Sequence, residues 1–125
     1  MMNVAKYFEN YQFIIAGAPS ISVDFYRSIT KDSYMPVLSN KTHALLKECK
    51  AAIITSGTAT LEAAILGAPQ VVCYKTSFIS YIIGKLLVKV KYIALVNLIC
   101  DKEVVKELIQ DDFNIENLVN ELNHI

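Results

Sequence analysis

Short apolar runs rich in β-branched residues alternate along the chain with segments of helical periodicity, and this alternation limits the possible folds more than any other feature. It is typical of βα units around a mostly parallel sheet. Parallel strands that are buried on both faces are continuously apolar, as Ile53-Ile54 and Val71-Val72-Cys73 are. We therefore predict an α/β fold with a Rossmann-like, mostly parallel sheet and helices on both faces. The predicted strands are residues 12–16, 36–38, 51–55, 70–74 and 92–96.

Helical periodicity and helix-end signals define the segments between these strands. Asn40 and Asp101 are placed as N-caps, whereas Gly67 and Pro69 are placed to stop a helix. Residues 4–8 form only a stub of helix before the first strand, so we expect the 125 residues to be a single domain cut from a longer protein. The predicted helices are residues 23–29, 41–49, 60–66, 79–88, 102–109 and 115–122.

The composition excludes several classes of protein. With 54% hydrophobic and 19% charged residues, the chain can bury one core of ordinary size. Twelve Lys and Arg balance twelve Asp and Glu, which argues against binding of nucleic acid, because such binding needs a basic surplus. The three cysteines are far apart in apolar contexts, and the N-terminus lacks the apolar stretch of a secretory signal. These features predict buried thiols and a cytoplasmic location.

Residues 78–100 are very apolar, but Lys85, Lys89 and Lys91 interrupt them. A lysine at the centre of a bilayer costs about 3 kcal/mol, so we interpret the segment as a helix and a strand rather than a membrane span. Apolar residues of 79–90 can line one stripe while the lysines meet anionic head groups, which predicts weak peripheral contact with a membrane surface. The alternative is that this stripe packs on the sheet or on another domain.

Small and polar residues follow the predicted strands, at the edge of the sheet where ligands of doubly wound folds bind. Ser56-Gly57-Thr58 can hold an anion, because glycine allows a close approach and the next helix begins with unpaired N–H groups. Glu62 lies one turn later and can accept hydrogen bonds from two ribose hydroxyls. The alternatives are an ordinary helix cap for Ser56 and Thr58, and a solvated first-turn residue for Glu62.

The sequence holds no recognisable catalytic set or metal site. His43 and His124 have no evident Ser, Cys or Asp partner, and we interpret both as structural or solvated. Glu103 and Glu107 have lysine neighbours, as on an exposed helix face. The glycine-rich loops of dinucleotide dehydrogenases and P-loop nucleotidases are absent, so we expect no cofactor.

Several stretches, in order, closely resemble the C-terminal half of lipid-A-disaccharide synthases, and the likeness covers almost the whole chain. The stretches are residues 12–20, 56–64, 69–75, 86–89, 92–98 and 105–110.

The resemblance implies the C-terminal half of a B-type glycosyltransferase, which holds a UDP-sugar donor. It implies that Ser56, Gly57 and Thr58 face the diphosphate, that Glu62 faces the ribose and that Asn97 faces the nucleotide cleft. Lys75 and Gln110 match recurrent positions of the family. The sequence departs from the family at two other positions. Val96 stands where proline is common, and Asp101 stands where glycine is often found.

The implied reaction transfers 2,3-diacylglucosamine from its UDP derivative to 2,3-diacylglucosamine 1-phosphate and releases UDP. In the family, the lipid acceptor and the proposed catalytic residue belong to the N-terminal half, so we expect no catalytic residue here and no activity from this part alone. Two alternatives stay open. One is another UDP-sugar transferase or epimerase of the same architecture, and the other is a non-catalytic α/β module that binds a partner through residues 78–90.

Overall fold

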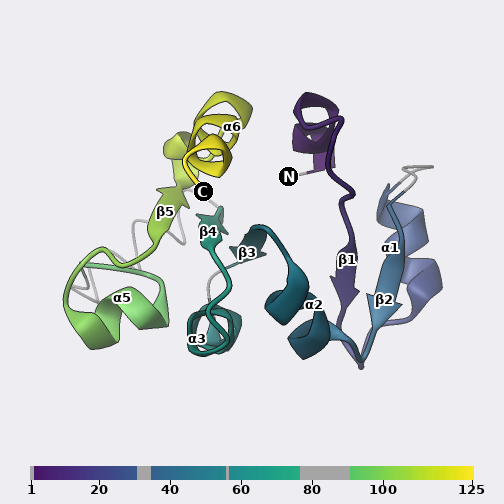
Figure 1. Ribbon diagram of the computed structural model, residues 1–125, viewed down its shortest axis with the longest axis horizontal. Helices are drawn as coiled ribbons and strands as arrows, with labels where there is room; N and C mark the ends of the chain where they lie inside the picture. Colours follow the sequence, from purple (N-terminus) through teal and green to yellow (C-terminus); the bar gives the residue numbers. More distant parts are fainter. Residues whose placement is uncertain (1, 31–34, 56, 77–90) are drawn as a thin grey trace.

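A computed structural model describes residues 2–30, 35–55, 57–76 and 91–125. Within these residues the strands form two parallel sheets, which confirms the predicted α/β class. Figure 1 shows the small sheet with α1 beside it at one side of the molecule, the larger sheet at the other side, and α2 between them. The small sheet pairs β1 (Ile15–Gly17) with β2 (Val37–Ser39), and the larger has the order β3 (Ala52–Thr55), β4 (Gln70–Tyr74), β5 (Lys106–Ile109).

The helices of the described residues are mostly short. They are η1 (Met2–Tyr7), α1 (Val23–Thr30), α2 (Thr42–Glu48), α3 (Thr58–Ile65), α5 (Leu95–Cys100), η2 (Gln110–Asp112) and α6 (Ile115–Asn123). In the part of the chain that the structure describes, no helix has both the length and the apolar character needed to cross a membrane. The predicted helix 79–88 and the proposed membrane-facing stripe of 79–90 lie outside the described residues. Of the three lysines assigned to that surface, only Lys91 is described.

Strand β4 is the centre of the larger sheet and is buried on both faces. Val71 and Cys73 point to one face, where they cluster with Leu118 of α6. Val72 points to the other face, against which Ala64 of α3 packs. The alternation follows from the two-residue period of a strand, and it confirms that helices cover both faces of this sheet.

Helix α3 ends at the predicted glycine stop. Gly67 has φ of 72° and donates its N–H to the Ala64 carbonyl at 3.1 Å. The N–H of Ala68 donates to the Ala63 carbonyl at 2.9 Å. Together these bonds form a Schellman motif, whose left-handed residue is usually glycine because a side chain would be strained there.

The sequence prediction was wrong around residue 100. A strand was predicted at 92–96, but helix α5 begins at Leu95, and the predicted helix 102–109 contains strand β5 instead. Strand β5 pairs in parallel with β4, and its Leu108 is only 3% exposed in the core beside Cys73. This burial overrides the helix propensity of the local Lys and Glu residues.

Two predicted N-caps were also wrong. Asn40 has φ of 57° in the turn before α2, and the cap position of that helix is Lys41. Asp101 does not begin a helix but ends α5, as its C-cap. Both residues have short polar side chains that tolerate the left-handed region better than most residues, which accounts for their places in these turns.

The three cysteines differ in burial. Cys73 is 1% exposed on β4, and this burial raises the pKa of its thiol to about 11. Burial also raises the pKa of Cys49, which is half-buried, whereas Cys100 at the end of α5 is exposed. The prediction of buried thiols is therefore confirmed for Cys73 and wrong for Cys100.

We expect a thiol reagent at pH 8 to modify Cys100 first and Cys73 last. At that pH a thiol with a pKa of about 11 is only about one part in a thousand thiolate, which is the reactive form. Cys100→Ser should remove the fastest phase of labelling with a chromogenic disulfide, and denaturant should make the remaining thiols react together. A fast phase that survives Cys100→Ser would contradict the observed burial.

Candidate functional site

The carboxyl ends of β3, β4 and β5 lie at one edge of the larger sheet, because all three strands are parallel. Gly57 and Thr58 follow β3, Lys75 follows β4 and Gln110 follows β5. The structure therefore brings together predicted site residues from three separate parts of the sequence. Ser56 lies outside the described residues.

The first turn of α3 is open at this edge. Gly57 occupies the N-cap position with φ of 138° and ψ of −164°, a backbone conformation that other residues rarely adopt. Gly57 and Thr58 are both exposed. The first N–H groups of a helix lack the usual partners within the helix, and glycine has no side chain that could cap them. Here the Thr60 N–H donates to the Gly57 carbonyl at 3.2 Å, which leaves the donors before it as the candidates for a ligand. An anion can therefore reach these donors.

Glu62 lies one turn further along α3, and its closest polar partner comes from α2. Oε2 of Glu62 lies 3.4 Å from Nε2 of His43. The Glu62 side chain is 46% exposed and the His43 side chain 72%. The exposed side chain of His43 agrees with its interpretation as a solvated residue. Its contact with Glu62 could not be seen in the sequence, because only folding brings α2 beside α3.

Two further predicted residues lie at the same edge. The Gln110 side-chain oxygen accepts a hydrogen bond from the Thr76 N–H at 3.1 Å, which links the segment after β5 to the segment after β4. Lys75 is exposed and lines a cavity of about 220 Å³ at the start of α6, together with Phe113 and Leu118. Lys75 thus provides a positive charge at this edge, whereas the Gln110 oxygen is already engaged by the protein.

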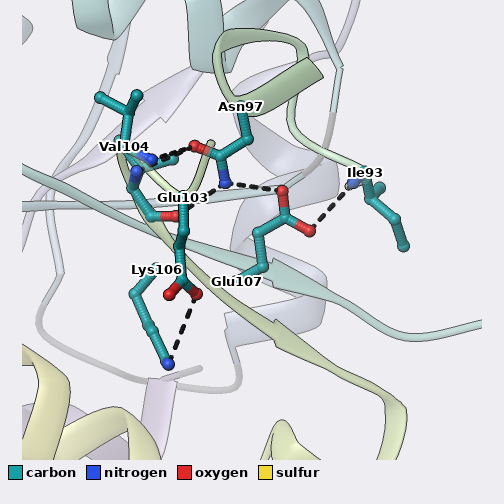
Figure 2. A network of polar contacts seen from close by, with 7 residues as sticks. Ile93, Asn97, Glu103, Val104, Lys106 and Glu107 are labelled. Carbon is teal, nitrogen blue, oxygen red and sulfur yellow. Dashed lines mark hydrogen bonds and ion pairs between the residues drawn. The ribbon is translucent and has the colours of Figure 1, made fainter. Parts of the chain in front are cut away.

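Asn97 lies elsewhere, in α5 beside the start of β5, and is fully buried. Its Nδ2 donates to the Val105 carbonyl and to Oε1 of Glu107, both at 2.8 Å. Its Oδ1 accepts from the N–H of Val104 at 2.7 Å and from the N–H of Val105 at 2.9 Å. Figure 2 shows this amide enclosed by its partners. The predicted place of Asn97 after a strand was wrong, because the residue belongs to α5.

The Glu107 carboxylate completes the same network. It accepts from the N–H of Ile93 at 2.9 Å and from Asn97, as Figure 2 shows. It also accepts from the N–H of Ala94 at 2.9 Å. Glu107 had been interpreted as part of an exposed charged face, which was wrong. Glu103 does belong to such a face, because its exposed carboxylate lies 3.4 Å from Nζ of Lys106.

The two departures from the family pattern have local explanations. Val96 is the second residue of α5, where a helix N–H lacks a partner and proline is tolerated. Asp101 has φ of 47° and ψ of 34°, the left-handed region in which glycine is preferred and Asp is accepted. Both substitutions therefore keep the backbone of α5.

Comparison with known proteins agrees with this resemblance over almost the whole chain. The sequence model of the family described as Lipid-A-disaccharide synthetase matches residues 3–124. The chain belongs to this family.

Curated members of the lipid-A-disaccharide synthetase family share substantial identity with the chain. The lipid-A-disaccharide synthase of Sulfurihydrogenibium sp. (strain YO3AOP1) is 39% identical over 129 residues, covering 94% of this chain and 33% of that protein. The synthase of Psychromonas ingrahamii is 38% identical over 120 residues, covering 93% of this chain and 32% of that protein. That of Acidobacterium capsulatum is 51% identical over 79 residues, covering 63% and 20%. The chain thus spans about a third of the length of the first two relatives.

In this member of the lipid-A-disaccharide synthetase family, we expect Glu107→Gln to lower the free energy of unfolding by about 1.5–3 kcal/mol, because a partly buried, charged acceptor of three hydrogen bonds is lost. The new amide would turn a donor toward N–H groups that need an acceptor. Urea denaturation measures the change, and Glu103→Gln is the matched control, which should cost less than about 0.5 kcal/mol because its ion pair is exposed. Equal effects of the two substitutions would contradict the network.

Proposed function

We propose that this chain is the donor-binding part of a lipid-A-disaccharide synthase. The whole enzyme would be a hexosyltransferase that transfers 2,3-diacylglucosamine from its UDP derivative to 2,3-diacylglucosamine 1-phosphate and releases UDP. The observation that carries the proposal is the open first turn of α3, with Glu62 one turn beyond it, at the carboxyl edge of a parallel sheet. Ligands of doubly wound folds bind at this edge.

The diphosphate would lie at the start of α3. The N–H groups of the exposed residues Gly57 and Thr58, together with the positive end of the helix dipole, favour an anion. The Thr58 hydroxyl can add a hydrogen bond, and by family resemblance Ser56 contributes another. As the bond to the sugar breaks, negative charge grows on the leaving UDP, and donors already aimed at it stabilise the transition state.

Glu62 would hold the ribose. Its partly exposed carboxylate can accept from two neighbouring hydroxyls, since a carboxylate offers two oxygens with about four acceptor sites. Lys75 is placed to add positive charge near the phosphates, and Gln110 to keep the loops after β4 and β5 together. Direct contact between Asn97 and the nucleotide stays a prediction, and it would require the amide to leave its present partners.

The chemistry proposed for these residues uses no resident metal or cofactor. Within the described ranges, the His, Cys, Asp and Glu side chains form no group of three or more that could hold a metal ion. By family resemblance, the lipid acceptor and the catalytic base belong to the N-terminal half. We therefore expect no disaccharide from this part alone, because orienting both substrates supplies much of the rate.

The proposed location is the cytoplasm, with peripheral contact to the inner membrane. The support is chemical, because both substrates carry acyl chains. The sequence of 79–90 combines apolar residues with lysines, which suits an anionic lipid surface.

We expect Glu62→Gln to weaken binding of UDP about tenfold to a hundredfold, the usual effect of losing a charged hydrogen bond. The amide keeps the size of the side chain but accepts with one atom only. Isothermal titration calorimetry with UDP measures the change.

Glu116→Gln is the matched control, because Glu116 is also an exposed glutamate on a helix, in the first turn of α6. It should leave UDP affinity unchanged. Unaltered UDP binding in Glu62→Gln, with the melting temperature of the parent chain, would overturn the proposed ribose site. If the unsubstituted chain did not bind UDP at all, its assignment as the donor-binding part would be overturned.

A further inference from the structure

We propose that His43 is a positioning residue that holds the Glu62 carboxylate ready for the ribose of the nucleotide. The inference rests on the proposed function, and it adds a residue from α2 to a site otherwise built from α3 and the strand ends. The contact joins Nε2 of His43 to Oε2 of Glu62 at 3.4 Å. This is the separation of an ion pair, and because a carboxylate only accepts, the imidazole is the partner that can supply a proton to the contact.

The two side chains lie at the rim of a buried apolar interface. Leu46, one turn after His43 on α2, is 8% exposed, and Ala63, next to Glu62 on α3, is 0% exposed. Both belong to one cluster with Ile54 of β3. The positions of the two helices are thus set by apolar packing, which places the imidazole beside the carboxylate without depending on the polar contact.

The contact leaves the carboxylate able to bind a ligand. The contact from His43 is to Oε2. The other oxygen, Oε1, and the remaining acceptor site of Oε2 can receive two hydroxyl donors. The geometry is therefore compatible with simultaneous contacts to histidine and ribose.

The benefit of the contact is preorganisation. A free glutamate side chain loses rotamer freedom when a ligand orders it, and a contact made beforehand removes part of this loss. Exposed ion pairs contribute little to folding stability, so removal of the imidazole should change ligand binding more than unfolding. The effect should be confined to ligands whose hydroxyls need Glu62.

Calorimetric titrations of the full chain with UDP and with 2′,3′-dideoxy-UDP test the inference. His43→Phe keeps a ring but removes the donor, and it should weaken UDP binding about threefold to fivefold, the size expected for an exposed contact. Binding of 2′,3′-dideoxy-UDP should not change, because that ligand has no hydroxyls for Glu62. His43→Gln restores a donor and should recover most of the affinity.

A second comparison shows whether His43 acts through Glu62. In a Glu62→Gln background, His43→Phe should have no further effect, because the group that it positions is already altered. His124→Phe, at the exposed histidine after α6, is the matched control and should leave the affinity for both ligands unchanged. Should His43→Phe lower the melting temperature, His43→Asn makes the same test, because its amide is too short to replace the imidazole.

The outcomes separate the two proposals. If Glu62→Gln weakens UDP binding but His43→Phe does not, the role of His43 is overturned and the ribose site stands. If His43→Phe weakens the binding of both ligands equally, or weakens UDP binding as much in the Glu62→Gln background, the role of His43 is also overturned, because His43 would then act elsewhere. If Glu62→Gln itself has no effect, the ribose site fails.

Discussion

The pairing of β4 between β3 and β5 is the interaction on which the rest of the structure depends. Residues 70–73 of β4 are buried, with α6 on one face and α3 on the other. Because the three strands are parallel, their carboxyl ends meet at one edge, and the residues after them become neighbours. The candidate site is a consequence of this pairing, since its members come from positions 57, 75 and 110 of the sequence.

The two ends of the larger sheet use polar residues in opposite ways. At the amino end of β5, Asn97 and Glu107 are satisfied by the protein itself, and their bonds fix α5 to the strand. At the carboxyl end, Gly57, Thr58 and Lys75 are exposed. Polar groups that are already paired inside the protein are costly to disturb, whereas exposed donors are free to exchange water for a ligand. This difference favours the carboxyl end as the binding site.

Much of this arrangement could be predicted from the sequence, since the bounds of β4 follow from its apolar run and the end of α3 from Gly67. Helix α5 and strand β5 could not, because their local sequences favour the opposite structures and only pairing with β4 decides between them. The only hint of the Asn97 network in the sequence is a single polar residue within the apolar segment 93–100. The contact of His43 with Glu62 joins different helices, and local sequence holds no information on it.

The proposed function places UDP at the carboxyl edge of the larger sheet. The most direct test is a titration of the ¹⁵N-labelled chain with UDP, followed by NMR of the backbone amides. Binding at this edge should give the largest shift changes at Gly57 and Thr58, smaller changes at Thr76, and little change at Val104 and Val105 beside the buried Asn97. Changes concentrated at Val104 and Val105, with Gly57 and Thr58 unmoved, would contradict it.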